Sequence, residues 1–125
     1  MMTLKRGECS ILSLVLTRKW YEMIDAGLKR EEYRADTLYW RRRLANWDLA
    51  FNAHNTPVVE FRLGYASNAP RMAFWTFGLE TASGMRPYAH KAGSDHPEWG
   101  EPDGPHFIIR LGGRIELTKE SEAAK

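Results

Sequence analysis

The sequence predicts a small α+β domain built around a mixed sheet or barrel. Three observations support this. The 125 residues match the usual size of one domain, so we treat residues 1–125 as a single unit. Strand-like and helix-like segments alternate in the first half of the chain, and strand-like segments dominate the second half. The single cysteine, Cys9, cannot form an internal disulfide, so the hydrophobic core must hold the fold together.

The chain is expected to begin with a buried strand and a short amphipathic helix. Ile11 to Thr17 is an apolar, partly β-branched run, typical of a strand covered on both sides. Trp20, Met23 and Ile24 then recur at helical spacing, and Gly27 supplies the left-handed residue that ends the helix.

The next segment, Lys29 to Arg34, is unusually charged for an expected strand. Alternation puts Arg30, Glu32 and Arg34 on one face and Glu31 and Tyr33 on the other, with Lys29 at the exit of the glycine turn. A second helix should follow, with Trp40, Leu44 and Trp47 on one face and Arg41 and Arg42 turned away from it.

The second half is expected to be mainly β-structure. Val58 to Leu63 and Arg71 to Glu80 predict two strands, separated by a turn over Gly64 to Pro70. His106 to Leu117 predicts a closing hairpin with the Gly112-Gly113 pair at its tip.

The stretch Arg86 to Pro105 contains four prolines and three glycines and is expected to be a functional or disordered loop. It carries His90 and His96, and His106 follows it, with Asp95, Glu98 and Asp103 close by. Their spacing matches no metal-ligand pattern, and the chain has no glycine-rich phosphate loop. We therefore expect neither a metal nor a cofactor.

The charge distribution says more than the formal net charge of +2. Between Arg18 and Arg43 there are eight lysines and arginines against five acidic residues, which suits an anionic ligand. No run approaches the roughly 20 apolar residues of a membrane span. With the lone cysteine, this leads us to expect a cytoplasmic protein with no membrane partner.

Several aromatic and charged residues are candidates for a ligand site. Helical spacing favours core packing for Trp20, Trp40 and Trp47, whereas Tyr33, Tyr39, Tyr65 and Trp99 lie in or beside polar segments and are candidates for a ligand wall. Lys29, Glu32 and Arg34 form either a surface salt-bridge ladder or a buried cluster that serves a ligand, because buried charges must be paired or used.

Gly27, Lys29, Glu32 and Arg34 also reproduce a G-x-K-x-x-E-x-R signature, which we call the charged motif. In this motif the chain resembles the ASCH family of the PUA-like superfold. The flanking stretches ILSLVLTRKWYEMIDAG and LYWRRRL resemble members common in bacteria and phages, as do FRLGYASNAP and EWGEPDGPHFIIRLGG. The resemblance covers nearly the whole chain.

The resemblance implies a mixed β-barrel of about five or six strands, with two or more short helices at its rim and a charged cleft. Family members are thought to handle RNA or nucleosides; some resemble amidohydrolases acting on acylated nucleosides, and some have been described as ribonucleases. In the amidohydrolase-like members a threonine nucleophile stands where this chain has Glu32.

Two main functional hypotheses follow. In the first, Lys29 and Arg34 bind single-stranded RNA, a nucleoside or a nucleotide, Glu32 holds Arg34, and Tyr33, Tyr65 or Trp99 stacks on a base. In the second, the chain is a hydrolase acting on modified nucleosides or RNA, with Lys29 and Glu32 as catalytic residues. A third reading is an accessory interaction domain in which the motif is structural; the sequence identifies no protein partner.

Overall fold

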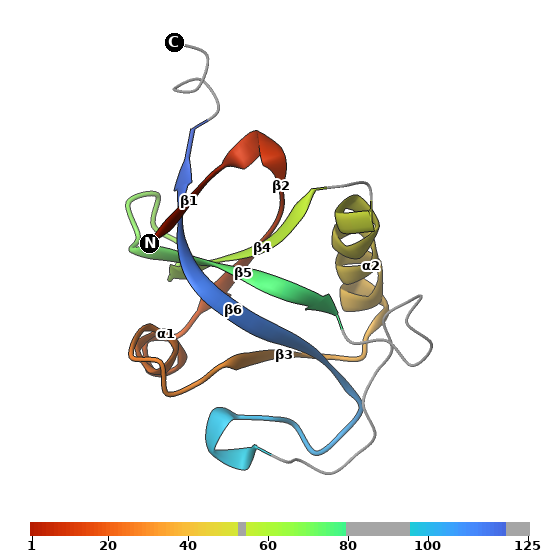
Figure 1. Ribbon diagram of the computed structural model, residues 1–125. Helices are drawn as coiled ribbons and strands as arrows, with labels where there is room; N and C mark the ends of the chain where they lie inside the picture. Colours follow the sequence, from red (N-terminus) through yellow and green to blue (C-terminus); the bar gives the residue numbers. More distant parts are fainter. Residues whose placement is uncertain (53–54, 80–95, 120–125) are drawn as a thin grey trace.

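In the computed structural model, which describes residues 1–52, 55–79 and 96–119, six strands form one mixed sheet with two α-helices (Figure 1). The elements run in the order β1 (Met2–Lys5), η1 (Arg6–Glu8), β2 (Cys9–Leu16), α1 (Arg18–Asp25), β3 (Glu31–Ala35), α2 (Leu38–Asn52), β4 (Thr56–Leu63), β5 (Arg71–Leu79), η2 (Pro97–Trp99) and β6 (His106–Thr118). None of the helices in these ranges is long and apolar enough to cross a membrane.

The 13-residue strand β6 organises the sheet. The strand order is β1-β6-β5-β4-β2, and β3 also pairs with β6. Ile109 pairs with both Glu32 of β3 and Leu79 of β5, and Ile115 pairs with both Met2 of β1 and Ala73 of β5. Therefore β3 and β1 follow one another along the edge of β6 that faces away from β5.

The sheet mixes parallel and antiparallel pairs. β2 runs parallel to β4 and β1 parallel to β6, whereas β4–β5, β5–β6 and β3–β6 are antiparallel. The β5–β6 ladder has two register shifts, which are irregularities of the kind that bend a sheet. Among the described residues, β2 pairs with neither β1 nor β3, so these ladders leave the sheet open.

Period-two alternation divides the hydrophobic residues between two clusters. Leu12, Leu14 and Leu16 of β2 belong to the larger cluster, while Cys9 and Ile11 of the same strand pack in the smaller one. The larger cluster also takes in Tyr21 and Ile24 of α1, Leu44 and Trp47 of α2, and Val59, Phe61, Met72, Phe74, Phe107, Ile109 and Leu111 of the sheet.

Reciprocal hydrogen bonds hold α2 against β2. The Trp47 indole donates to the Ser10 carbonyl at 2.9 Å, and the Ser10 hydroxyl donates to the Trp47 carbonyl at 3.0 Å. Trp47 and Leu44 are buried while Arg41 and Arg42 are exposed, which confirms the predicted faces of this helix.

The α+β class and most elements agree with the sequence prediction. The hairpin predicted over His106 to Leu117 is wrong, because this stretch is the continuous strand β6. A Cβ atom at Gly112 would lie 2.4 Å from the Trp75 ring, so this glycine makes room for an aromatic side chain rather than forming a turn. Of the loop predicted over Arg86 to Pro105, residues 86–95 lie outside the described ranges, and residues 96–105 contain η2.

Gly112→Ala is expected to lower the free energy of unfolding by about 1–3 kcal/mol, because the added methyl group overpacks against Trp75. The matched control is Gly104→Ala, where a Cβ meets nothing within 4 Å. Urea denaturation of both variants tests this. Equal stability of the two variants would show that the approach of Trp75 does not constrain β6.

Candidate functional site

The charged motif lies where α1 turns into β3. Gly27 has a φ of 76° and reverses the chain, and the backbone N–H groups of Leu28 and Lys29 both donate to the Met23 carbonyl, at 2.9 and 3.2 Å. Lys29 is thereby held against the end of α1. Glu32 and Arg34 follow two residues apart on one face of β3, where Glu32 pairs with Ile109 and Arg34 with Phe107 of β6.

Glu32 joins two cations through its two oxygens. Lys29 Nζ donates to Glu32 Oε1 at 2.8 Å, and Arg34 Nη1 donates to Glu32 Oε2 at 2.5 Å. Lys29 and Glu32 are each 3% exposed, and the Arg34 side chain is 18% exposed. The cluster therefore holds two positive charges against one negative charge almost out of water, and the surface salt-bridge reading does not fit this burial.

Aromatic rings cover both cations. Lys29 Nζ lies 4.3 Å from the centroid of a Trp20 ring and 5.4 Å from that of Tyr33. The Arg34 guanidinium lies 5.0 Å from a Trp40 ring, which the Arg43 guanidinium also approaches, at 5.2 Å. Cation–π contacts of desolvated cations stabilise by about 2 kcal/mol or more, so these rings offset part of the cost of burial.

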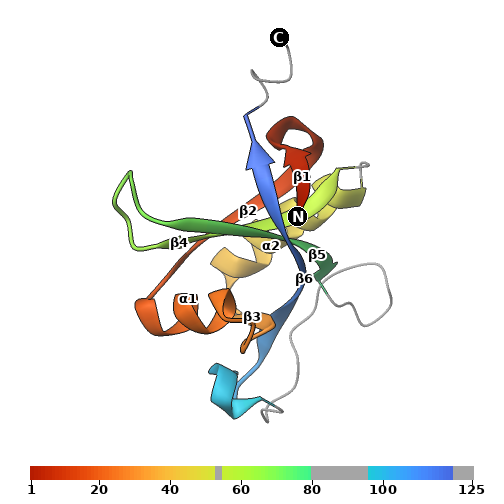
Figure 2. The ribbon, with the colours of Figure 1, turned by 60° about the vertical axis from the view of Figure 1, so that its left-hand side comes forward.

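A cavity of about 220 Å³, which we call the Lys29 cavity, opens beside this cluster. Its wall comes from the end of β2, the start of α1, β3 and the segment after η2, and consists of Val15, Leu16, Thr17, Trp20, Lys29, Glu32, Tyr33, Arg34, Gly100 and Pro102. Both ribbon views show the η2 segment (cyan) close to β3 and α1 (Figures 1 and 2). Gly100 has a φ of 80°, and a Cβ there would lie 2.7 Å from Trp20, so glycine is needed at this wall.

A buried pair, Glu101 and His106, fixes the segment that closes the cavity. His106 Nε2 lies 2.7 Å from Glu101 Oε2, and His106 Nδ1 lies 2.7 Å from the Gly104 carbonyl oxygen. Because that carbonyl only accepts, Nδ1 carries a hydrogen. Glu101 Oε1 also accepts from the backbone N–H of His96 at 2.9 Å, which ties both ends of the segment together.

Tyr33 forms the floor between the cavity and this pair. Its ring meets His106 edge to face at 5.7 Å, and its hydroxyl donates to Glu31 Oε1 at 2.9 Å. Burial raises the pKa of Tyr33 well above its usual value, and the hydrogen bond to Glu31 together with nearby carboxylates raises it further.

The sequence-predicted site residues do not all meet. Lys29, Glu32, Tyr33 and Arg34 line one cavity. Tyr65 is 84% exposed and lines a neighbouring cavity. Trp99 stacks on His96, with ring centroids 4.1 Å apart, and is absent from the described wall of the Lys29 cavity.

Four contributors to the site were missed in the sequence. Helical spacing predicts core packing for Trp20 and Trp40, and Trp40 does pack against the larger hydrophobic cluster. Each of the two rings also lies over a cation of the motif, which helical spacing does not indicate. The sequence presents His106 only as a metal-ligand candidate, and no motif distinguishes Glu101 from the other acidic residues. The described residues contain no group of three or more His, Cys, Asp or Glu suited to a metal ion, while His90 and Asp95 lie outside the described ranges.

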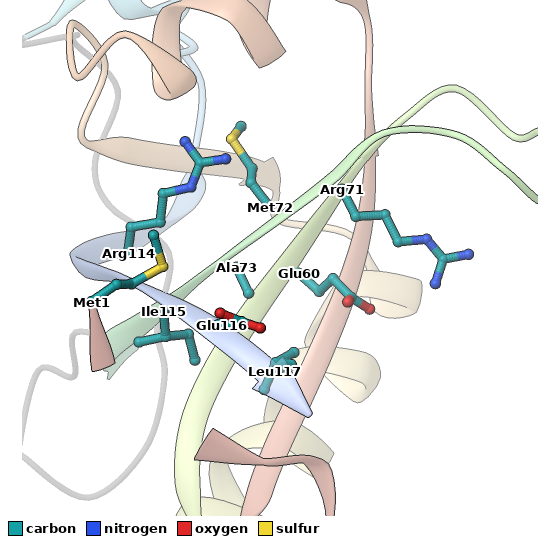
Figure 3. A pocket seen from close by; sticks show the side chains of 9 residues that line it. All are labelled: Met1, Glu60, Arg71, Met72, Ala73, Arg114, Ile115, Glu116 and Leu117. Carbon is teal, nitrogen blue, oxygen red and sulfur yellow. The ribbon is translucent and has the colours of Figure 1, made fainter. Parts of the chain in front are cut away.

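A second cavity, of about 330 Å³, borders the smaller hydrophobic cluster (Figure 3). Its wall includes two arginines and two glutamates. Glu60 is paired with Arg6 at 2.5 Å, and Arg114 with Asp25 at 2.5 Å. Figure 3 shows Arg71 and Arg114 pointing in different directions rather than converging. We therefore take the Lys29 cavity, where the charges converge, as the candidate site.

Comparisons of the chain with protein-family models, with curated proteins and with solved structures each found no match.

Glu32→Gln is expected to lower the free energy of unfolding by about 3–5 kcal/mol, because it leaves two buried cations without their shared carboxylate. The matched control is Glu22→Gln, which breaks only the exposed 3.6 Å pair with Arg18 and should change stability by less than about 0.5 kcal/mol. Urea denaturation measures both. If both variants lost the same small amount of free energy of unfolding, Glu32 would not be the residue that holds the cluster together.

Tyr33→Phe is expected to flatten the alkaline loss of stability. Since the pKa of Tyr33 is raised in the folded chain, its contribution is complete below pH ~10, where the unfolded chain's tyrosines begin to ionise, and is lost at higher pH. The wild type should lose about 1.4 kcal/mol per pH unit more than Tyr33→Phe above pH ~10.

Urea denaturation at several pH values between about 9 and about 11.5, a range that spans the ordinary tyrosine pKa, measures this difference. Tyr65→Phe, at an exposed position, is the control and should follow the wild type. Parallel curves for wild type and Tyr33→Phe would contradict the prediction.

Proposed function

We propose that the chain is an ASCH-like domain that binds a nucleoside or nucleotide, free or as part of single-stranded RNA, in the Lys29 cavity. The observation that carries this proposal is the convergence of Lys29 and Arg34 on Glu32 at one cavity. Two cations share one carboxylate there, so the motif has an excess positive charge for an anionic or acceptor-rich ligand.

Arg34 is the residue we expect to contact the ligand directly. It is the most exposed of the three charged residues, and its hydrogen bonds to Glu32 and to the Tyr33 carbonyl both use Nη1. Within the described part of the chain, Nε and Nη2 make no hydrogen bond and can donate to phosphate oxygens or to the acceptors of a base edge. Lys29, which is deeper, contributes mainly positive potential.

The size of the cavity limits the ligand. Its volume of about 220 Å³ is below the roughly 300–1,000 Å³ of sites for drug-sized molecules, which suits one base or nucleoside. Trp20 and Tyr33 provide aromatic walls of the kind on which bases stack.

The PUA-like β-barrel and the ASCH family membership are part of the same proposal. They are supported by the charged motif and by the mixed six-stranded sheet, in which β6 bends visibly along its length (Figure 1). Closure of the sheet into a barrel requires pairs beyond the ladders described above.

The competing proposal is a hydrolase that uses Lys29 and Glu32. The geometry favours binding, because each Glu32 oxygen accepts a hydrogen bond from a cation and position 32 carries no hydroxyl nucleophile. An RNA or acylated-nucleoside product that is formed by the wild type and lost in Lys29→Met would favour the hydrolase instead.

Arg34→Ala is expected to weaken binding of nucleoside 5′-monophosphates and of short single-stranded RNA by ~10-fold to ~150-fold, the worth of one or two hydrogen bonds to a charged donor. Isothermal titration measures the affinity for the monophosphates, and fluorescence anisotropy measures the affinity for the RNA. Arg42→Ala is the control, because it removes the same charge from the exposed face of α2.

Circular dichroism checks that the Arg34 variants fold. Arg34→Lys is a second variant, which keeps a cation beside Glu32 but loses the planar guanidinium and its paired donors. Affinities of Arg34→Ala and Arg34→Lys equal to that of the wild type would remove this proposal.

A further inference from the structure

A third cavity adjoins the Lys29 cavity and shares part of its wall. This Tyr65 cavity, of about 440 Å³, is lined by Val15, Leu16, Thr17, Arg18, Leu63, Gly64 and Tyr65. Val15, Leu16 and Thr17 line both cavities. Since Leu16 pairs with Leu63 of β4, the two cavities lie side by side across the end of β2.

Tyr65 presents an exposed ring on a fixed turn. Gly64, with a φ of 85°, begins the turn after β4, and Arg62 Nη2 donates to the carbonyls of Tyr65 and Ala66 at 3.1 and 2.8 Å. The backbone of the turn is therefore held while the Tyr65 ring is 84% exposed. A flat partner that stacks on this ring therefore has to order only the side chain and not the backbone of the turn.

Thr17 lies at the boundary between the two cavities, and the next residue, Arg18, lines the Tyr65 cavity. The Thr17 side chain makes no capping hydrogen bond at the start of α1, although it occupies the N-cap position. The Arg18 side chain is 70% exposed, and its ion pair with Glu22, at 3.6 Å, is of the surface kind that stabilises little. Both side chains are thus available to an anionic group that passes between the cavities.

On the basis of the proposed function, we propose that the two cavities hold consecutive nucleotides of a single RNA strand. The first nucleotide occupies the Lys29 cavity, and the base of the second stacks on Tyr65. The phosphate that links them contacts Thr17 and Arg18. The Tyr65 cavity, at about 440 Å³, lies within the usual range for a ligand site and is the larger of the two.

A nucleic acid strand fits these observations better than a protein segment. The hydroxyl of Thr17 lies at the boundary, the cation of Arg18 follows it in the Tyr65 cavity, and the ring of Tyr65 is exposed. Together these groups match a phosphate followed by a base. The cavity of Figure 3 lacks this combination, because its wall in the described part of the chain has neither a hydroxyl group nor an aromatic ring.

The test compares a mononucleotide with a dinucleotide by isothermal titration. The probes are the adenine and uracil nucleoside 5′-monophosphates and the corresponding 5′-phosphorylated dinucleotides. The wild type is expected to bind at least one dinucleotide ~5-fold to ~150-fold more tightly than its mononucleotide, the usual effect of stacking one base.

Each variant has its own expected result. Tyr65→Ala should remove the part of the dinucleotide advantage that comes from stacking and leave the smaller part that comes from the linking phosphate. It should not change mononucleotide affinity, because Tyr65 is outside the Lys29 cavity. Arg18→Ala should weaken the dinucleotide and reduce the slope of log affinity against log salt by about 0.7, as expected for one lost phosphate contact on a single strand. Arg71→Ala, which removes an exposed arginine of the Figure 3 cavity, should change neither affinity.

The outcomes separate this inference from the proposed function. If both mononucleotides and dinucleotides bind equally well, or if Tyr65→Ala leaves the advantage intact, the second subsite is overturned while the Lys29 site stands. If the wild type binds none of the four probes, the proposed function and the inference fall together.

Discussion

Two cations share a single buried carboxylate at Glu32, and the geometry of the site follows from that constraint. Lys29 and Arg34 approach it from opposite sides of the motif, one from the turn after α1 and one from β3. Neither could stay almost out of water without its partner, since an unpaired buried charge is strongly unfavourable. The rings of Trp20 and Trp40 then complete the enclosure, so the site depends on both helices as well as on β3.

Part of this arrangement could be predicted from sequence. The period of two in a strand places Glu32 and Arg34 on one face, and the glycine at position 27 predicts a turn with Lys29 at its exit. Both features are local. The amphipathic face of α2, with Leu44 and Trp47, could be predicted for the same reason, because helical spacing alone determines which side chains face the core. That Lys29 meets Glu32 could not be predicted, because alternation does not extend across the turn.

The rest depends on contacts between segments distant in sequence. A pair of glycines in sequence can form the tip of a hairpin or can leave space for a neighbouring aromatic ring. At Gly112 only the position of the Trp75 ring shows that the second alternative holds. Spacing shows that Trp20 lies on the inner side of α1 but not that Lys29 lies opposite. The Glu101–His106 pair fixes the segment between η2 and β6 through two buried side chains, and neither side chain belongs to a recognisable sequence motif. The short edge strand β1 was not predicted at all.

We propose that the Lys29 cavity, with its excess positive charge, binds a nucleotide. Backbone and indole N–H chemical shifts, recorded by ¹H–¹⁵N correlation spectra during titration with adenosine 5′-monophosphate, test it without altering the protein. We expect the largest changes at the Trp20 indole and at the amides of Arg34 and Gly100, which line that cavity. Changes confined to the cavity of Figure 3, or no changes at saturating nucleotide, would contradict it.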